Sequence, residues 1–158
     1  MIALGIDPGA GGALAFFDTI LGSLVVVDMP VLEVERGGKS KREINPRLIA
    51  DMVLEHAPKA AMLEKVGAMP GQGVSSMFQF GRGVGMVEGV LAGVGVPTQY
   101  VTPQRWQKAV GARKGKDGAR LRAIELYPAY SKLFARAKDD GRADAALIAW
   151  YAAMTMQP

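Results

Sequence analysis

The sequence predicts a single mixed α/β domain in which short buried strands alternate with helices. The chain has 158 residues, of which 49% are hydrophobic and 22% charged, so it can bury one sizeable core. Three apolar runs follow one another at 2–6, 13–17 and 24–28. Farther on, apolar runs of strand length alternate with longer segments of helical spacing. We therefore expect one domain over residues 1–158.

The first half of the chain predicts four strands and one helix. Short Gly-containing turns separate the three initial runs, which is typical of a meander. Residues 33–45, EVERGGKSKREIN, are polar and predict a flexible surface loop. Asn45-Pro46 is typical of a helix start, and this helix should end before Pro58. Residues 59–66 then predict a strand and residues 67–73 a loop.

The second half predicts one more strand and four helices, giving the order βββαβαβααα. A long helix capped by Ser75 or Ser76 should end near Gly93, with glycines recurring every four residues on one stripe. The other expected elements are a strand at 98–101, a short helix from Pro103 that holds Trp106, a Gly/Lys-rich loop at 111–118, and helices at 117–126 and from 141 or 142 to 154. The stripe, Gly81, Gly85 and Gly89, would let a neighbouring backbone approach closely.

Composition excludes several kinds of chemistry. The chain has no cysteine, so disulfides, thiol nucleophiles and cysteine-based zinc sites are excluded. The lone histidine, His56, falls on a predicted helix and is expected to pack there. No signal peptide is recognisable and no apolar run approaches the ~18 residues that span a bilayer, so we expect a cytoplasmic protein without a membrane partner. If the protein is an enzyme, carboxylates are therefore the side chains expected to carry out its chemistry.

Positive charge is concentrated in one segment. The net charge is +4, but residues 101–125 contain seven basic and two acidic residues. A local basic patch on a nearly neutral body indicates a polyanionic partner, although a solvated Lys/Arg-rich surface is the alternative.

Carboxylates stand where structure alone does not need them. Asp7 ends the first strand, directly before the turn Pro8-Gly9-Ala10-Gly11-Gly12, and Glu64 lies near the end of the fourth. Asp144 is on an otherwise apolar helix, with Asp140 one turn earlier. Each has a structural alternative: an Asx-turn for Asp7, a surface ion pair for Glu64 and an N-cap for Asp140. Asp144 is costly to bury alone, which favours convergence of the four acids around cations.

Such a group of carboxylates predicts a hard-metal site. Oxygen donors without His or Cys suit Mg²⁺, for which Mn²⁺ can substitute. Two ions about 3.5–4 Å apart can activate water and stabilise a leaving 3′-oxygen in phosphodiester hydrolysis. The Gly-rich turn after Asp7 would let a phosphate approach.

Several motifs in order resemble one known family. The segments IALGIDPGAGGALAFFD, AMLEKV, GQGVSSMFQFGRGVGMVEGVL, VTPQRWQKAVG and DDGRADAALIAWYA are together similar to RuvC-type Holliday junction resolvases, especially the short phage- and prophage-borne members. This family belongs to the ribonuclease H-like superfamily. The resemblance extends from residue 2 to about residue 154.

The resemblance implies a fold, an activity and a partner. The expected fold is a five-stranded mixed sheet flanked by helices, and the expected assembly is a homodimer. The expected activity is Mg²⁺-dependent, symmetric nicking of four-way junctions that leaves 5′-phosphate and 3′-hydroxyl ends, with no nucleotide cofactor. Asp7, Glu64 and Asp144 match the family's acids. The family's remaining acid would fall at Gly141, so Asp140 is expected to replace it, with Asp139 as the alternative.

The same comparison suggests DNA contacts. Lys108 follows the T-P-x-x-W-like element, where the family carries basic residues near the scissile phosphate, and is expected to offset developing charge together with or in place of Lys114. Gln72 or Phe78 could reach the open centre of a junction, whereas Phe78 and Phe80 could instead be core aromatics. Met77 and Met86, with the glycine stripe, could line a dimer seam or pack internally. The predicted DNA-binding residues are Gln72, Phe78, Arg105, Lys108, Arg113, Lys114, Lys116 and Arg120.

Two other functions fit parts of the sequence. A non-catalytic module that binds branched DNA would explain the shifted fourth acid. An actin-like ATPase domain shares the Gly-rich turn, but this chain is too short for two such lobes, and the basic segment would have no role there.

Overall fold

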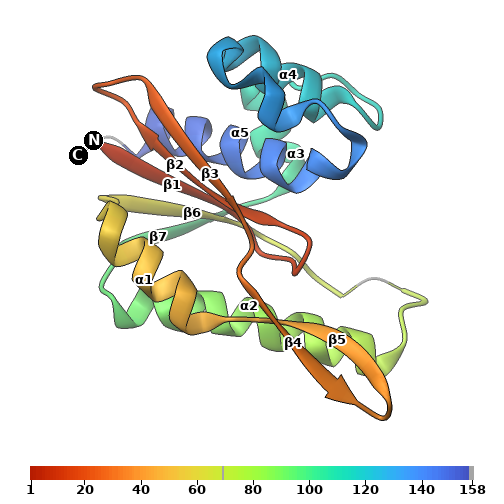
Figure 1. Ribbon diagram of the computed structural model, residues 1–158. Coiled ribbons are helices and arrows are strands. Elements are labelled where there is room, and N and C mark those ends of the chain that lie inside the picture. The colour runs from red at the N-terminus through yellow and green to blue at the C-terminus, as the bar shows by residue number, and fades with distance from the viewer. Residues whose placement is uncertain (69, 157–158) are drawn as a thin grey trace.

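A computed structural model, which describes residues 1–68 and 70–156, contains a five-stranded sheet with helices on both faces (Figure 1). The strands of this sheet are β1 (Ile2–Asp7), β2 (Ala13–Asp18), β3 (Ser23–Asp28), β6 (Ala60–Glu64) and β7 (Thr98–Val101). The helices are α1 (Pro46–His56), α2 (Val74–Gly93), α3 (Pro103–Val110), α4 (Gly118–Leu126) and α5 (Asp140–Thr155), with short 3₁₀ helices η1 (Pro128–Phe134) and η2 (Ala137–Asp139).

The sheet is mixed, and its strand order is β3-β2-β1-β6-β7. β1, β2 and β3 form the antiparallel meander that the first three apolar runs predicted. β6 and β7 then add in parallel on the other side of β1. The expected five-stranded mixed sheet flanked by helices is confirmed.

Two hydrophobic cores lie on opposite faces of the sheet. Alternation along β1 sends Leu4 and Ile6 into the core beneath α1 and α2, whereas Ala3 faces α3, α4 and α5. Gly5 shares the face of Ala3, and α5 passes so close that a Cβ there would be 2.2 Å from the carbonyl oxygen of Ala145. The position needs glycine because helix backbone occupies the space of a side chain.

The helix signals in the first half of the chain are confirmed. The amide of Leu48 donates to Asn45 Oδ1 at 3.3 Å, which caps α1, and Pro46 begins the helix. His56 packs in the last turn of α1, with its ring centroid 4.2 Å from that of Phe16. The predicted serine cap of α2 is wrong, because Gly73 holds the cap position and no side chain bonds there.

The expected loop at 33–45 is instead a β-hairpin of β4 (Val31–Arg36) and β5 (Lys39–Ile44). Gly37 and Gly38 both have positive φ, as a two-residue type I′ turn requires. The hairpin lies beside α2 (Figure 1), where Ile44 packs over Gly83 and Glu43 pairs with Arg82 at 3.0 Å. No strand signal is present in the sequence here, because most side chains of both strands are exposed and so show no alternation of apolar and polar residues.

The glycine stripe of α2 does not serve packing within the chain. A Cβ added at Gly81, Gly85 or Gly89 would meet no atom within 4 Å among the described residues. The internal packing considered from the sequence is therefore wrong for these three positions. No helix within the described residues is both long and apolar enough to span a bilayer.

Candidate active site

Asp7 and Glu64 lie side by side because they end neighbouring parallel strands. Ile6 of β1 is paired with Leu63 of β6, so the next residue on each strand is a carboxylate. Alternation then decides which way they point. Side chains an even number of residues apart on a strand lie on the same face of the sheet, so Asp7 shares the face of Ala3 and Glu64 that of Met62. Ala3 and Met62 both belong to the core under α5. Both carboxylates therefore face α5.

The helix α5 brings a third carboxylate to these strand ends. The contact of its backbone with Gly5 fixes α5 against β1, and Asp144 directly precedes the contacting Ala145. The charges of Asp7 and Glu64 both act on Asp144 and raise its pKa. Thus three acids that are far apart in sequence lie near one another at one edge of the sheet.

These three acids are unusually reluctant to ionise. Burial, followed by the charge of Glu64, raises the pKa of Asp7 to about 6, although a bond from the Gly9 backbone opposes this. Burial and the neighbouring acids raise the pKa of Asp144 to about 8. Burial also raises the pKa of Glu64. Across residues 1–68 and 70–156, no cation forms an ion pair with any of the three.

Trp106 positions Glu64, a role that the sequence did not reveal. Its indole Nε1–H donates to Glu64 Oε1 at 2.8 Å, and its ring is completely buried. The bond lowers the pKa of Glu64 and so partly opposes burial. A signal was present in the sequence, because Trp106 stands in the first turns of a helix that directly follows the strand next to β6. A buried indole usually donates to an acceptor, and Glu64 ends β6.

The structure distinguishes the two alternatives for a fourth acid. Asp139 is only 1% exposed and accepts hydrogen bonds from Arg136, which lower its pKa. Asp140 instead lines a cavity with Asp144, and its charge contributes to the raised pKa of Asp144. The geometry therefore brings Asp140, and not Asp139, to the other acids.

Gly141 cannot supply the acid that the family pattern places there. A Cβ at this position would lie 2.7 Å from the Gly11 carbonyl oxygen and 3.1 Å from Asp7 Oδ2. The first turn of α5 is packed directly on the Gly-rich turn after Asp7. A side chain at 141 would have to push that turn away, which explains why the acid stands one residue earlier.

The predicted basic residues divide into two groups. Lys114 and Lys116, with Arg113, line a cavity of about 360 Å³ together with Asp140 and Asp144. Arg105 and Lys108 are exposed on α3, but among the described residues it is Gln107 that lines this cavity from that helix. Lys108 does not line this cavity.

Arg120, predicted to bind DNA, is instead engaged with two carboxylates of the chain. Its side chain is 12% exposed and donates to Asp140 Oδ1 at 2.8 Å, and it also pairs with Asp117. Arg120 thus ties the start of α4 to the start of α5, and it balances part of the charge of Asp140.

Of the two phenylalanines of α2, Phe80 lines a second cavity, on the segment that follows Glu64, and Phe78 does not. A cavity of about 580 Å³ is lined by Gln72, Phe80 and residues that follow Glu64. Phe78 is 67% exposed, so its interpretation as a core aromatic is wrong. Met86 lines a smaller cavity between α2 and the hairpin, and Met77 is half-buried.

The residues present fit a hard cation. No group of three or more His, Asp or Glu side chains in the described residues is already arranged around a single ion position. The donor set is nevertheless all oxygen, mostly buried and without cationic partners at Asp7, Glu64 and Asp144, so that its charge requires compensation.

Sequence comparison finds one similar protein of known function. No family model matches the chain. The chain is 30% identical over 149 residues to the chloroplastic Holliday junction resolvase MOC1 of Chlamydomonas reinhardtii, covering 80% of this chain and 17% of that protein. The chain thus spans about a sixth of the length of this relative.

Solved structures share the fold. RuvC of T. thermophilus in complex with a Holliday junction substrate has a TM-score of 0.65 at 16% identity, covering 98% of this chain and 96% of that one. A second Thermus thermophilus RuvC structure gives 0.61 at 19% identity over the same shares. The yeast mitochondrial Holliday junction resolvase Ydc2 gives 0.50 at 17% identity over 93% and 75%. The chain has the RuvC fold, which is ribonuclease H-like.

Proposed function

We propose that this chain is a metal-dependent endonuclease that resolves Holliday junctions or related branched DNA. The observation that carries the proposal is the meeting of Asp7, Glu64 and Asp144 at one edge of a RuvC-fold sheet, where no cation from the described residues pairs with them. The similarity to MOC1 supports the same substrate class. A neighbouring cavity with three basic side chains supports binding of a phosphate backbone.

The acids would hold Mg²⁺, for which Mn²⁺ can substitute, and two ions per site suit four carboxylates. When bound, such ions supply a more acidic water and charge stabilisation for the leaving 3′-oxygen, which leads to 5′-phosphate and 3′-hydroxyl ends. With a pKa of about 8, Asp144 holds a proton at neutral pH that it must lose before it can serve as a ligand, whereas Asp7, with a pKa of about 6, is mostly ionised there.

The other residues of the chain bind and orient. Trp106 fixes one oxygen of Glu64, and Arg120 fixes one oxygen of Asp140. The turn after Asp7 carries no side chain at Gly11, where a Cβ would meet no described atom within 4 Å, so a phosphate would find room there. Lys114 and Lys116 would contact the strand on the side of Asp140 and offset developing charge. Lys108 remains a proposed contact on exposed α3.

We also propose a homodimer, because two symmetric nicks require two sites. The exposed stripe of α2 supports this, since Gly81, Gly85 and Gly89 leave its backbone open to a second helix. The exposed Phe78 on the same helix adds apolar surface. A Gly85→Leu variant should be a monomer by light scattering, whereas the wild-type chain should be a dimer.

The deciding experiment uses Asp7→Asn on a labelled four-way junction. We expect loss of Mg²⁺-dependent nicking with retained junction binding, since removal of a negative charge does not harm phosphate affinity. Asp51→Asn is the matched control, because Asp51 is exposed on α1 in a pair with Arg47. Full nicking by Asp7→Asn would refute the assignment.

A non-catalytic module that binds branched DNA is the second candidate. It is favoured by the engagement of Asp140 with Arg120 and by the absence, within the described residues, of a ready-made metal group. Junction binding by the wild-type chain without nicking in Mg²⁺ or Mn²⁺ would select it. A panel of branched and linear DNA, with cation and with chelator, tests both candidates together.

A further inference from the structure

A second basic cavity lies beside the Gly-rich turn, and the sequence predicted no function for the four cationic side chains that line it. Its volume is about 260 Å³. Four cationic side chains and two carboxylates line it, together with the backbone of the turn. The lining residues are Ala10, Gly11, Gly12, Asp28, Arg42, Arg136, Lys138, Asp139 and Arg142. The positive charges exceed the negative ones by two.

One buried carboxylate organises two of the arginines. Asp139 Oδ2 accepts from the backbone amide of Arg136 at 2.9 Å, and its two oxygens accept from Arg136 Nε and Nη2 at 3.1 and 2.9 Å. Arg142 Nη1 lies 3.6 Å from the same carboxylate. Arg142 also donates twice to Asp28, at 2.6 and 2.7 Å. These guanidinium groups are therefore held in place before any ligand arrives.

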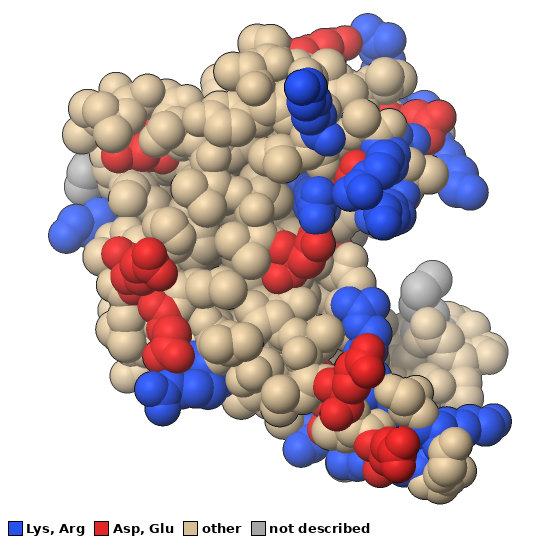
Figure 2. Space-filling model, viewed as in Figure 1, with Lys and Arg blue, Asp and Glu red and all other residues tan. Residues whose placement is uncertain are grey.

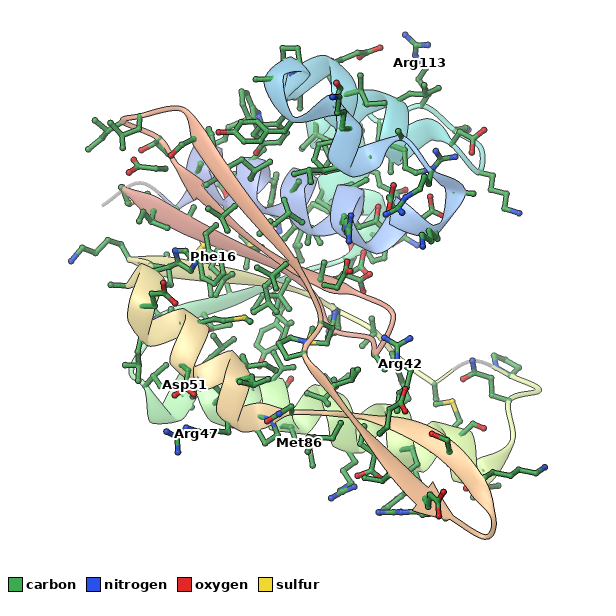
Figure 3. All side chains as sticks on the ribbon, viewed as in Figure 1. Phe16, Arg42, Arg47, Asp51, Met86 and Arg113 are labelled. Atoms are coloured by element: carbon green, nitrogen blue, oxygen red, sulfur yellow. The ribbon has the colours of Figure 1, made fainter. Side chains whose placement is uncertain are left out.

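The other two cations are available to a ligand. Lys138 is exposed and forms no ion pair with any described residue. Arg42, from β5 of the hairpin, likewise has no acidic partner in the described part of the chain. Its Nη2 donates to the carbonyl oxygen of Ala10 at 3.0 Å, which holds the side chain beside the tip of the turn (Figure 3).

The two basic cavities lie on opposite sides of α5. Asp140 and Asp144 face the cavity of Lys114 and Lys116, whereas Arg142 is about 200° farther round the helix from Asp140. Gly141, between these two faces, packs on the turn and on Asp7. Figure 2 shows a notch in the molecule with basic side chains on both of its sides and acidic side chains nearby.

We propose that the cavity of Arg42, Lys138 and Arg142 is a second phosphate subsite for the DNA backbone, an inference that rests on the proposed nuclease function. The subsite and the Lys114/Lys116 cavity would bind phosphates of the same DNA strand on either side of Asp7. A helix is about 10–12 Å across, so only a few phosphates of one strand separate the two contacts. The subsite reads charge and not base sequence.

The test compares two double variants in junction binding with chelator present. Arg42→Ala/Lys138→Ala should lower the slope of log affinity against log salt by about 0.9, which is the loss of one phosphate contact. That slope change corresponds to an affinity about eightfold weaker at 0.1 M salt, relative to 1 M. Arg47→Ala/Lys59→Ala is the control, because both residues are exposed and Lys59 lies at the opposite end of β6 from Glu64. Lys138→Ala alone, at a fully exposed position, repeats the test with the Arg42 bond intact.

A methylphosphonate scan locates the contact. Neutralising one phosphate within a few nucleotides of the nick should weaken wild-type binding severalfold and have no further effect in the double variant. Equal sensitivity of both proteins at every position, or an unchanged salt slope, would overturn the subsite while wild-type nicking leaves the nuclease function standing. A wild-type chain that neither binds nor nicks branched DNA would overturn both.

Discussion

Replacing Asp144 by asparagine should make the metal-free protein more stable at neutral pH, although it removes a proposed catalytic group. Asp144 is buried among carboxylates on an otherwise apolar helix, and in the described residues it has no cationic partner. Its charged form is therefore a cost to the folded state that asparagine does not have.

The size of the effect follows from the pKa. The pKa of Asp144 rises from 3.8 to about 8 on folding. The folded state then holds a proton that the unfolded state releases, so stability is highest below about pH 4 for this group and falls as the pH rises toward 8. At pH 7, roughly three pH units above the unfolded pKa, deprotonation of the unfolded state lowers the free energy of unfolding by up to about 4 kcal/mol. Burying an imperfectly paired amide costs about 2 kcal/mol, which leaves a gain of about 2 kcal/mol.

Thermal unfolding with chelator, measured from pH 5 to pH 8, checks this expectation. For a chain of this size 2 kcal/mol corresponds to about 4–8 °C at pH 7, and the gain should shrink toward pH 5. Mg²⁺ should stabilise the wild-type chain at pH 8 and stabilise Asp144→Asn less. Asp51→Asn, at an exposed pair on α1, should change stability by less than about 0.5 kcal/mol.

Two results would refute this reasoning. One is a wild-type chain that becomes more stable between pH 5 and pH 8 without metal. The other is an Asp144→Asn variant that melts below the wild type at pH 8 while Asp51→Asn does not. Either result would mean that the three carboxylates do not repel one another in the folded protein.

Three further substitutions test the packing around the acids. Trp106→Phe removes the bond that lowers the pKa of Glu64, so the acidic limb of the pH–rate profile should move to higher pH; an unmoved limb in a folded variant contradicts the positioning role. Gly5→Ala should destabilise the chain by 3 kcal/mol or more in urea, because its Cβ would meet the backbone of α5 at 2.2 Å, whereas Gly85→Ala, which meets nothing, should not destabilise the fold. Gly141→Ala should reduce nicking more than junction binding, because its Cβ displaces the turn beside Asp7, and equal losses of both would argue against this.

The sequence by itself determined the parts that local rules govern. Asp7 and Glu64 each end an apolar run, and the period of two along a strand already decides that each faces away from its preceding core residue. Asp144 on an apolar helix required compensation that no neighbour in sequence provides. Helix caps at Asn45 and Pro46 depend on adjacent residues alone, so they too were predictable.

Only the tertiary structure decided how distant groups pair. The hairpin of β4 and β5 has exposed strands without an apolar alternation, and it is held by Ile44 against Gly83, a contact that depends on where α2 lies. Asp139 is bound by Arg136 and Arg142, each only three residues away along the chain. That Asp140 instead lies at the cavity of the acids, paired with Arg120 of α4, depends on how α4 and α5 pack. Packing likewise decides on which side of α5 each basic side chain lies, because the sequence gives the order of the charges along the chain but not how the segments that carry them are placed around the helix.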